Sequence, residues 1–434
     1  MKKSAFGKSI TAIFTSIMLL ACSQELPNEM FTETANEQEY INNLSQNRTY
    51  EEALAIAQDA IGMLGENCVT RSGRPRSIST DNVQYIVSTS STRSSDVSDT
   101  LMYVFNCEDN AGFAVVAANR AFEGLIAVTE QGNYIVGEES ENEGFNLYMD
   151  MATSYLLGFD DRLDIDTTTG GFDQLIDYKS KTFKDTITGG NQANVRWGGL
   201  WAPYTTYCPV GTSAGCEVVA IAQIMSIYKK PSSIKIDFGS NNYNLALDWN
   251  AIVSHKTVST CGAMGTCPGD NQIGLLFRQL GEEIDISYSN TSGSYGHYIA
   301  DAFIKLGYSI GNKMSYHSPT VLNSIKQGKS VFMCGEDDNK NIAHAWIIDG
   351  YKCVRTTRIE STRPSGSLLW TNDTIVSEQY YNHINWGWDG YCNGYFFVSV
   401  LEPFSPTFID NGVEIKNTYD FDFDTDLYIY PYIY

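Results

Sequence analysis

The sequence contains, at residues 214–231, the stretch AGCEVVAIAQIMSIYKKP. Its residues are largely apolar up to the two lysines, 229 and 230, that precede Pro231. A proline cannot continue a helix, so the helix is expected to end there. This pattern predicts a helix buried on all sides, with Cys216 in its first turn. Backbone N–H groups and the positive end of the helix dipole favour a thiolate there, so Cys216 is a candidate nucleophile. The alternative is a cysteine that merely fills a helix, since cysteine is often buried.

The residue before this cysteine, Gly215, has no side chain and lets a substrate backbone approach closely. The backbone N–H of Cys216 is then placed to join an oxyanion hole.

A thiol nucleophile needs a base, and the chain has five histidines. His344 opens the apolar run 345–348, as expected for a strand that starts at the mouth of a cleft. His383, which opens the run 383–386, is the main rival. The other three histidines stand in polar or helix-start sequence and are expected to be solvated: His255, His297 and His317.

An imidazole that works with a thiolate must be held in orientation, usually by an amide or carboxylate on its second nitrogen. Asn385 can supply that amide, and the ring of Trp386 can shield the bond from water. The alternative is that Asn385-Trp386-Gly387-Trp388 is a tight aromatic turn at the end of a strand.

The N-terminus predicts export. Three lysines precede an apolar run at 10–21, which is too short to span a bilayer comfortably and indicates a signal peptide. The run ends in Leu19-Leu20-Ala21-Cys22, which resembles the lipobox of bacterial lipoproteins, so Cys22 is a candidate lipidation site and the chain is expected to be anchored to a membrane. By the same resemblance, Ser23 favours the outer membrane of a Gram-negative bacterium. A plain secretory leader is the alternative.

The length, composition and net charge of the 434-residue chain limit its possible domain organisation and partners. Their number favours two folded units, and 43% hydrophobic with 18% charged residues is ordinary for globular protein. The net charge of -22 argues against nucleic acid as a partner and against a basic membrane-docking patch.

The pattern along the chain predicts a polar tether, then a helix at 50–64, strands at 101–106, 112–118 and 125–128, and a helix at 144–157. Residues 158–194 are polar and Gly-rich and predict an exposed connection between units. The expected domains are a signal peptide (1–22), a tether (23–49), a propeptide-like unit (50–190) and a catalytic unit (191–434).

Cysteine spacing predicts one small loop clamped by Cys261 and Cys267, because an exported location permits disulfides. No C-x-x-C pair with nearby histidines is present, so neither a metal nor an organic cofactor is expected.

Several motifs together resemble the streptopain-type cysteine peptidases. They occur in the order seen in that family, over residues 195–403: Pro203-Tyr204, Cys208-Pro209, Gly215-Cys216, residues 222–225 with Pro231, residues 343–351, residues 385–388 and residues 394–396. Residues 103–133 are similar to the propeptide of that family. The resemblance implies an α+β, papain-like two-lobed peptidase preceded by an α+β propeptide.

The resemblance also implies roles for individual residues. Cys216 is the implied nucleophile, His344 the general acid and base, and Asn385 with Trp386 the orienting and shielding pair. Ser292, Gly293 and Ser294 resemble the loop that lines the substrate cleft.

Departures from the family pattern bear on activity. No glutamine stands at 197–201, where the family has an oxyanion donor, and Gln192 or an N–H near Gly199 is the nearest substitute. Glu217 replaces an apolar residue, and its carboxylate raises the pKa of the thiol unless it points to solvent. The insertion 353–378 is expected to form a hairpin over one lip of the cleft.

The expected function is a cysteine endopeptidase, made as a zymogen, that cleaves proteins or peptides through a thioester. Its own propeptide is expected to cover the cleft until the chain is cut near 181–194. The composition of these residues is that of an exposed segment, which is typical of cleavable linkers. A permanently attached partner-binding domain is the alternative for the N-terminal unit. Two other functions stay open: an inert lipoprotein that binds peptides or inhibits a protease, and a peptidoglycan-cleaving Cys/His hydrolase.

Overall fold

The structure is a computed structural model. It describes residues 47–64, 75–79, 83–87, 100–120, 122, 124–160, 176–257, 267, 269–289, 293, 298–337, 342–364, 368–401, 407–410, 413–416 and 425–434. Cys22, Ser292, Ser294 and His297 lie outside these residues.

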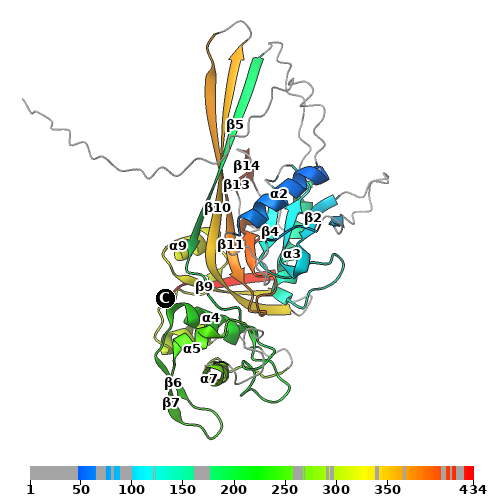
Figure 1. The fold of residues 1–434 in the computed structure, drawn as a ribbon. Coiled ribbons are helices and arrows are strands. Elements are labelled where there is room, and N and C mark those ends of the chain that lie inside the picture. The colour runs from blue at the N-terminus through cyan, green and yellow to red at the C-terminus, as the bar shows by residue number, and fades with distance from the viewer. Residues whose placement is uncertain are drawn as a thin grey trace, which may run out of the picture.

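An 11-stranded sheet runs through the molecule. Its strand order is β1 (Gln84–Val87), β2 (Thr100–Asn106), β3 (Phe113–Ala117), β4 (Leu125–Thr129), β12 (Gly394–Phe397), β11 (Thr371–Asn385), β10 (Ile342–Pro364), β9 (Ser330–Asp337), β15 (Thr425–Ile433) and β8 (Met314–Ser315). The remaining strand, β5 (Ile176–Gly190), pairs with β10. Helices lie on both sides of this sheet (Figure 1), and the α+β class expected from the sequence is confirmed.

The N-terminal unit is the antiparallel meander β1 to β4 with two helices. Helix α2 (Tyr50–Gly62) begins at a capping box, in which Thr49 and Glu52 satisfy each other's backbone N–H groups. Helix α3 (Glu143–Asp160) buries Phe145, Tyr148 and Ala152 against the sheet. A short 3-10 turn, Glu108–Asn110, links β2 to β3. The predicted helices and strands of this unit are confirmed.

Strand pairing joins the two units into one sheet. Residues 394–396 of β12 pair with 127–129 of β4, and the hydrophobic core beneath contains Phe145 and Tyr148 of α3 together with Trp346, Trp386 and Phe396. The N-terminal unit therefore shares a hydrophobic core with the C-terminal unit.

The part of the C-terminal unit that surrounds the helix predicted from residues 214–231 forms a second hydrophobic core, and we call it the second lobe. Helix α4 (Cys216–Tyr228) begins at Cys216, and ten of its 13 residues are buried. It packs against α5 (Trp249–Ser254), α7 (Asp270–Glu283) and strands β9 and β10. Helix α8 (Ile299–Lys305) and the hairpin of β6 (Ser233–Ile236) and β7 (Tyr243–Ala246) belong to this lobe.

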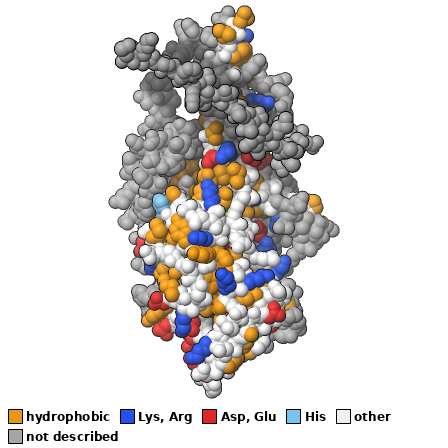
Figure 2. Space-filling model, turned by 90° about the vertical axis from the view of Figure 1, so that its left-hand side faces the viewer, with side chains coloured by type: hydrophobic (Ala, Val, Ile, Leu, Met, Phe, Trp, Pro, Cys, Tyr) orange, Lys and Arg blue, Asp and Glu red, His pale blue; other side chains and the backbone are white. Residues whose placement is uncertain are grey.

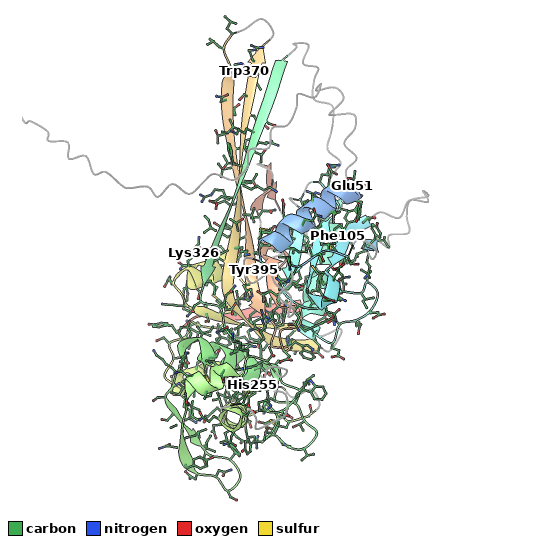
Figure 3. The ribbon with its side chains drawn as sticks, in the orientation of Figure 1. Glu51, Phe105, His255, Lys326, Trp370 and Tyr395 are labelled. Carbon is green, nitrogen blue, oxygen red and sulfur yellow. The ribbon has the colours of Figure 1, made fainter. Side chains whose placement is uncertain are left out.

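A three-stranded ribbon of β5, β10 and β11 extends from the body of the molecule (Figure 1). The insertion 353–378 forms the expected hairpin, but the ribbon rises away from both lobes and Trp370 marks its outer end (Figure 3). The expected exposed connection is partly a strand, since 176–190 form β5. Because β5 pairs with β10 from Ile176 to Gly190, these polar residues form a strand whose side chains, where described, are mostly exposed.

The C-terminal strand β15 lies inside the sheet, between β9 and β8, and it packs against α9 (Ser318–Lys326). The remaining elements are the 3-10 turn Val398–Leu401 and the hairpin of β13 (Thr407–Asp410) with β14 (Val413–Lys416). In the part of the chain that the structure describes, no helix is both long and apolar enough to cross a membrane. On the face in Figure 2, lysine and arginine side chains lie interspersed with hydrophobic ones.

Candidate active site

Cys216 lies at the first turn of α4, as predicted. Gly215 forms the N-cap with φ of 91°, a conformation that favours glycine. The chain before it is held by a hydrogen bond of 2.8 Å from the N–H of Ala214 to the carbonyl of Gly199. The thiol is therefore presented by a fixed turn, and Cys216 itself is partly exposed.

The surroundings of this thiol keep it protonated. Burial raises its pKa well above the ordinary value, and the charge of Glu217 adds to the rise, while a hydrogen bond from the N–H of Ala345 opposes it. The Sγ atom lies 3.4 Å from Oε2 of Glu217. Since the Glu217 residue is only 7% exposed, its carboxylate does not point freely to solvent.

His344 lies on β10 and is buried among aromatic rings. Its ring is 6.0 Å from that of Trp346 and 5.9 Å from that of Trp388, centroid to centroid. Its Nε2 lies 2.8 Å from the carbonyl oxygen of Trp386, which can accept a hydrogen bond only if Nε2 carries the proton. Burial lowers the pKa of His344 to about 4, so the ring is neutral at pH 7.

The structure does not bring the sulfur and the imidazole into a hydrogen-bonded pair. Side chains alternate along a strand, so His344 and Trp346 share one face of β10 while Ala345 lies on the other. Cys216 packs with the core that contains Ala345. Both groups are uncharged here, whereas a working pair is a thiolate facing an imidazolium.

The start of α3 touches the ring of His344. A side-chain carbon added at Gly144 would lie 2.6 Å from Cδ2 of His344 and 2.7 Å from Cε3 of Trp386. The N-terminal unit thus packs directly on the candidate base.

Asn385 has partners other than the histidine. Its Oδ1 accepts hydrogen bonds from Nε2 of Gln223, at 3.0 Å, and from the N–H of Gly387, at 3.2 Å, while its Nδ2 donates to the carbonyl of Val195 at 3.0 Å. Gln223 is fully buried on α4. Gln223 belongs to the motif at 222–225, and a glutamine two turns after Cys216 in an apolar helix is the sequence signal that marks it.

Trp386 stands beside the histidine, as predicted. Its indole N–H donates to the carbonyl of Cys392 at 3.0 Å, and its ring lies 5.0 Å from that of Trp346, centroid to centroid. Its carbonyl, rather than the amide of Asn385, holds His344.

The predicted substitutes for the oxyanion donor lie in different places. Gln192 donates to the hydroxyl of Tyr395 at 2.8 Å and lies next to Gly350. Gly199 lies next to Gly215, since a side-chain carbon there would be 3.6 Å from the N atom of Gly215. The backbone at Gly199 is therefore the substitute that lies beside the nucleophile turn.

Gly293 is the described member of the predicted cleft loop. Its carbonyl accepts a hydrogen bond of 2.9 Å from the N–H of Ser287. A side-chain carbon at this position would lie 3.8 Å from Oε1 of Glu217. Gly293 and Glu217 are therefore neighbours.

A cavity of about 530 Å³ opens between the two units. The N-terminal unit contributes Gln131, Glu139 and Glu141, and the second lobe contributes Gly199, Trp201 and Trp388 among others. Because Gly199 lies beside the nucleophile turn, the N-terminal unit forms one wall of a pocket next to the candidate site.

The rival histidine, His383, is committed to buried ion pairs. Its Nδ1 lies 2.5 Å from Oδ1 of Asp349, and its Nε2 lies 3.4 Å from Oε1 of Glu130. Burial alone would lower its pKa, but the charges and hydrogen bonds of the two carboxylates raise it to about 10. Glu130 also pairs with Arg196 at 2.5 Å. These contacts tie Glu130, the residue after β4, to β11 and to Arg196.

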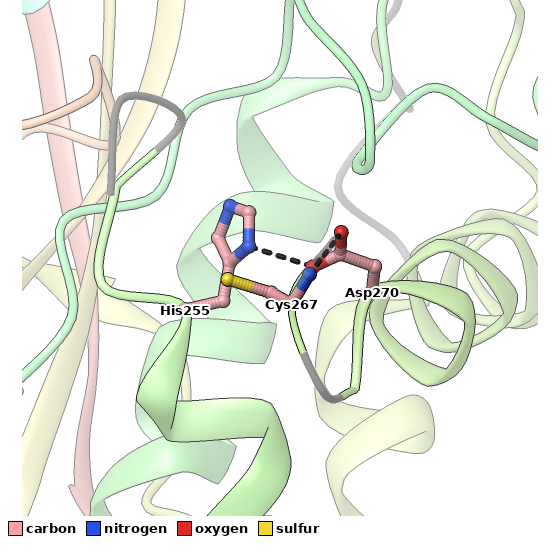
Figure 4. A group of neighbouring side chains, drawn as sticks. All are labelled: His255, Cys267 and Asp270. Atoms are coloured by element: carbon pink, nitrogen blue, oxygen red, sulfur yellow. Dashed lines mark hydrogen bonds and ion pairs between the residues drawn. The ribbon is translucent and has the colours of Figure 1, made fainter. Parts of the chain in front are cut away.

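The predictions for the other histidines are partly confirmed. His317 is exposed. The prediction for His255 is wrong, because this residue is only 2% exposed and its Nδ1 lies 2.8 Å from Oδ1 of Asp270 (Figure 4). Cys267 lies beside this pair but is disulfide-bonded, so its sulfur does not fit a metal ligand. The disulfide partner of Cys267 lies outside the described residues. The predicted partner, Cys261, lies outside them too, so the pairing stays a prediction.

Comparisons with known proteins match two regions of the chain to two families. Residues 197–396 match the Peptidase C10 family, and residues 38–155 match the Spi protease inhibitor family. Streptopain of Streptococcus pyogenes is 22% identical over 347 residues, which span 71% of this chain and 76% of that protein. The thiol protease/hemagglutinin PrtT of Porphyromonas gingivalis is 20% identical over 342 residues, 70% of this chain and 34% of that protein.

A solved structure shares the fold. A prointerpain A fragment from Prevotella intermedia superposes with a TM-score of 0.50 at 16% identity, covering 81% of this chain and 98% of that fragment.

Proposed function

This chain is a streptopain-type, papain-like cysteine peptidase with a propeptide-like inhibitor unit, and from that premise we propose that the structure is its latent form. Residues 50–190 act as the propeptide and 191–434 as the peptidase. Cys216 is the nucleophile, His344 the acid and base, and Asn385 with Trp386 the groups that orient and shield the imidazole.

One observation carries this proposal: Gly144 of the N-terminal unit packs on the ring of His344 while Cys216 stands at the start of α4, on the other face of β10. Activation has to free the ring from Gly144 and from the carbonyl of Trp386, and to bring it to the sulfur. The amide of Asn385 can then take over the second nitrogen of the ring by exchanging its bond from Gln223.

The proposed reaction is acyl transfer. The thiolate of Cys216 attacks the peptide carbonyl carbon, and the N–H of Cys216 with a backbone N–H near Gly199 stabilises the oxyanion. The C–N bond breaks as the imidazolium of His344 gives its proton to the leaving amine, which leaves a thioester. Water then attacks the thioester, His344 takes its proton, and the C–S bond breaks to restore the thiolate. These steps need no cofactor.

An epoxide-type thiol inhibitor tests this function. We expect the activated peptidase to bind one equivalent at Cys216, as located by mass spectrometry, and the full chain to react far more slowly. Cys216→Ser and His344→Ala should each abolish casein hydrolysis, whereas Cys353→Ser, at a buried cysteine near the ribbon base, should not. Hydrolysis that persists in Cys216→Ser contradicts the proposal.

A second candidate, an inert peptide-binding or protease-inhibiting lipoprotein, is favoured by the buried Glu217 beside the thiol. The same titration separates the two, because a dead site leaves Cys216 unlabelled after the N-terminal unit has been removed.

We further propose that the protein is exported and held at the outer membrane or cell surface through a lipid on Cys22. The support is the apolar run at 10–21 that ends in a cysteine. Labelling with a clickable fatty acid in a Gram-negative host tests it. The wild type should carry label and sediment with membranes, and Cys22→Ser should lose both. A wild-type chain without label overturns the anchor and leaves the peptidase proposal intact.

A further inference from the structure

One carboxylate of the N-terminal unit is held by two basic side chains of the catalytic unit. Oε2 of Glu130 lies 2.5 Å from Nη2 of Arg196, and Oε1 of the same carboxylate lies 3.4 Å from Nε2 of His383. The cluster lies next to Tyr395, whose ring centroid is 5.0 Å from that of His383 (Figure 3). When residues 50–190 leave on activation, as proposed above, Glu130 leaves with them and the two basic side chains stay.

The charges of this cluster balance while Glu130 is in place. Asp349 of β10 is buried, and its Oδ1 lies 2.5 Å from Nδ1 of His383. Burial lowers the pKa of His383, but the two carboxylates raise it to about 10, and Asp349 has the larger effect of the two, so the ring is charged at pH 7. The four side chains in contact are thus two cations and two anions. Without Glu130, two cations face one anion.

The cluster lies close to the candidate active site. Gln131, the residue after Glu130, lines the cavity of about 530 Å³ between the two units, and Gly199 lines it too. Arg196 is three residues before Gly199, so at most about 11 Å of backbone separates them. Since Gly199 lies beside the nucleophile turn, a peptide that is cut at Cys216 can bring a residue a few positions from the cleaved bond to Arg196.

The two basic side chains are suited to a carboxylate from another chain. The side chain of Arg196 is 42% exposed even with Glu130 in place, so a ligand can reach it from solvent. That of His383 is 7% exposed, and a charge with so little water around it is stabilised by an anion. The present occupant is an internal side chain, with the backbone continuing on both sides. An aspartate or glutamate within a substrate offers the same group in the same way.

We propose that Arg196 and His383 form a carboxylate-binding subsite of the activated peptidase, which Glu130 fills in the latent form and which takes an aspartate or glutamate side chain of the substrate. This inference rests on the proposed peptidase function and names a feature of its substrates. The N-terminal unit then blocks the peptidase at two places, with Gly144 against the ring of His344 and Glu130 in the subsite.

A rescue experiment in the full chain tests whether the site takes a free carboxylate. Glu130→Ala removes the atoms of one acetate ion from between Arg196 and His383. Sodium acetate should raise the melting temperature of this variant by on the order of 2 °C more than acetamide does at the same ionic strength. The wild type, whose site is filled, should show no such difference, and neither should Glu130→Ala combined with Arg196→Gln. Equal effects of acetate and acetamide on Glu130→Ala overturn the proposal.

Fluorogenic peptides test the role in substrate selection. They are assayed with the wild-type chain after activation, and each position on both sides of the cleaved bond is varied in turn between glutamate and glutamine. We expect one position at which kcat/KM for glutamate exceeds that for glutamine by on the order of 10-fold. Equal values at every position overturn the proposal. This assay decides alone if Glu130→Ala does not fold.

Arg196→Gln supplies the matched variant for the peptide assay. The glutamate-to-glutamine ratio should fall to within a few-fold of one, while peptides with glutamine are cut as before. Arg355→Gln, at an arginine of the ribbon that pairs with Glu378 at 2.6 Å, should keep the wild-type ratio. A ratio that survives in Arg196→Gln overturns the assignment of Arg196. If the wild type cuts no peptide while acetate still stabilises Glu130→Ala selectively, the peptidase proposal fails and the carboxylate site stands.

Discussion

Gly144 at the start of α3 approaches the imidazole of His344 so closely that a side-chain carbon in its place would stand 2.6 Å from Cδ2 of the ring. Real contacts of this kind are essentially never so short, so either the ring, Trp386 or the helix would have to move. The N-terminal unit thus fits the catalytic lobe through the absence of a side chain at one position.

Gly144→Ala is therefore expected to loosen the latent form. Alanine favours a helix by about 1 kcal/mol over glycine, but overpacking a dense core costs roughly 1–3 kcal/mol, so the full chain should lose stability. Chemical denaturation measures the change, and labelling of Cys216 should become faster.

Gly62→Ala is the matched control. This glycine ends α2 with nothing within 4 Å of an added side-chain carbon, so its replacement should leave stability unchanged or slightly higher. If both variants behave alike, the contact with His344 does not matter for latency.

The thiol should become more reactive when Glu217 loses its charge. Burial and the carboxylate both raise the pKa of Cys216, so Glu217→Gln removes one of the two causes and should lower the pKa. The rate of alkylation by iodoacetamide, measured against pH in the full chain, should shift to lower pH. An unchanged profile would mean that burial alone holds the proton.

Stability should depend on pH through the contact of His383 with Asp349 and Glu130. The pKa of His383 is raised to about 10, so its contribution is complete below the ordinary value near 6.5 and is lost as pH rises through 10. The pKa of Glu130 is lowered to about 2, so its contribution is complete above its ordinary value of 4.5 and is lost as pH falls through 2.

The measurement is the difference in free energy of unfolding between the wild type and His383→Gln. This difference should be greatest near pH 6 and should shrink toward pH 10. His344 acts in the opposite sense, since a pKa lowered to about 4 costs stability as pH falls from its ordinary value. Because the wild type and His383→Gln both contain His344, the contribution of His344 to the free energy of unfolding cancels in the difference between them.

Limited proteolysis should spare residues 176–190. Every one of these residues pairs with β10, and a protease needs a free extended segment, so the early cuts in the full chain should fall outside β5. N-terminal sequencing of the fragments checks this. A first cut inside 181–190 would show that the ribbon opens readily and would support the cleavage region expected from composition.

The elements that could be predicted from the sequence are those whose pattern is local. Helix α4 is an example, because a continuous apolar run that ends at Lys229 and Pro231 indicates a buried helix without knowledge of its neighbours. The meander β2 to β4 and helix α3 are others. In contrast, β5 consists mostly of polar residues, and these form a strand because the hairpin of β10 and β11 offers them an edge.

In the candidate site, too, some features could be predicted from the sequence and others depend on tertiary contacts. Residue types, order and spacing pointed to Cys216, His344 and Trp386, and the structure places Trp386 beside His344 as expected. The partner of Asn385 was not predictable, because Gln223 lies on α4 and meets Asn385 only after the two lobes pack. His255 shows the same limit, since its burial depends on Asp270, 15 residues further along the chain.

By itself, the sequence determined which residues can do chemistry, since ionisation at a helix start and the periodicity of apolar residues are properties of short segments. The tertiary structure alone decided which of them meet. Whether the ring of His344 lies near the sulfur of Cys216 or against Gly144 depends on which face of β10 it occupies and on what packs there. That choice is made by contacts such as that of Gly144 with His344, which are 200 residues apart in the sequence, and no local pattern contains the energies of such contacts.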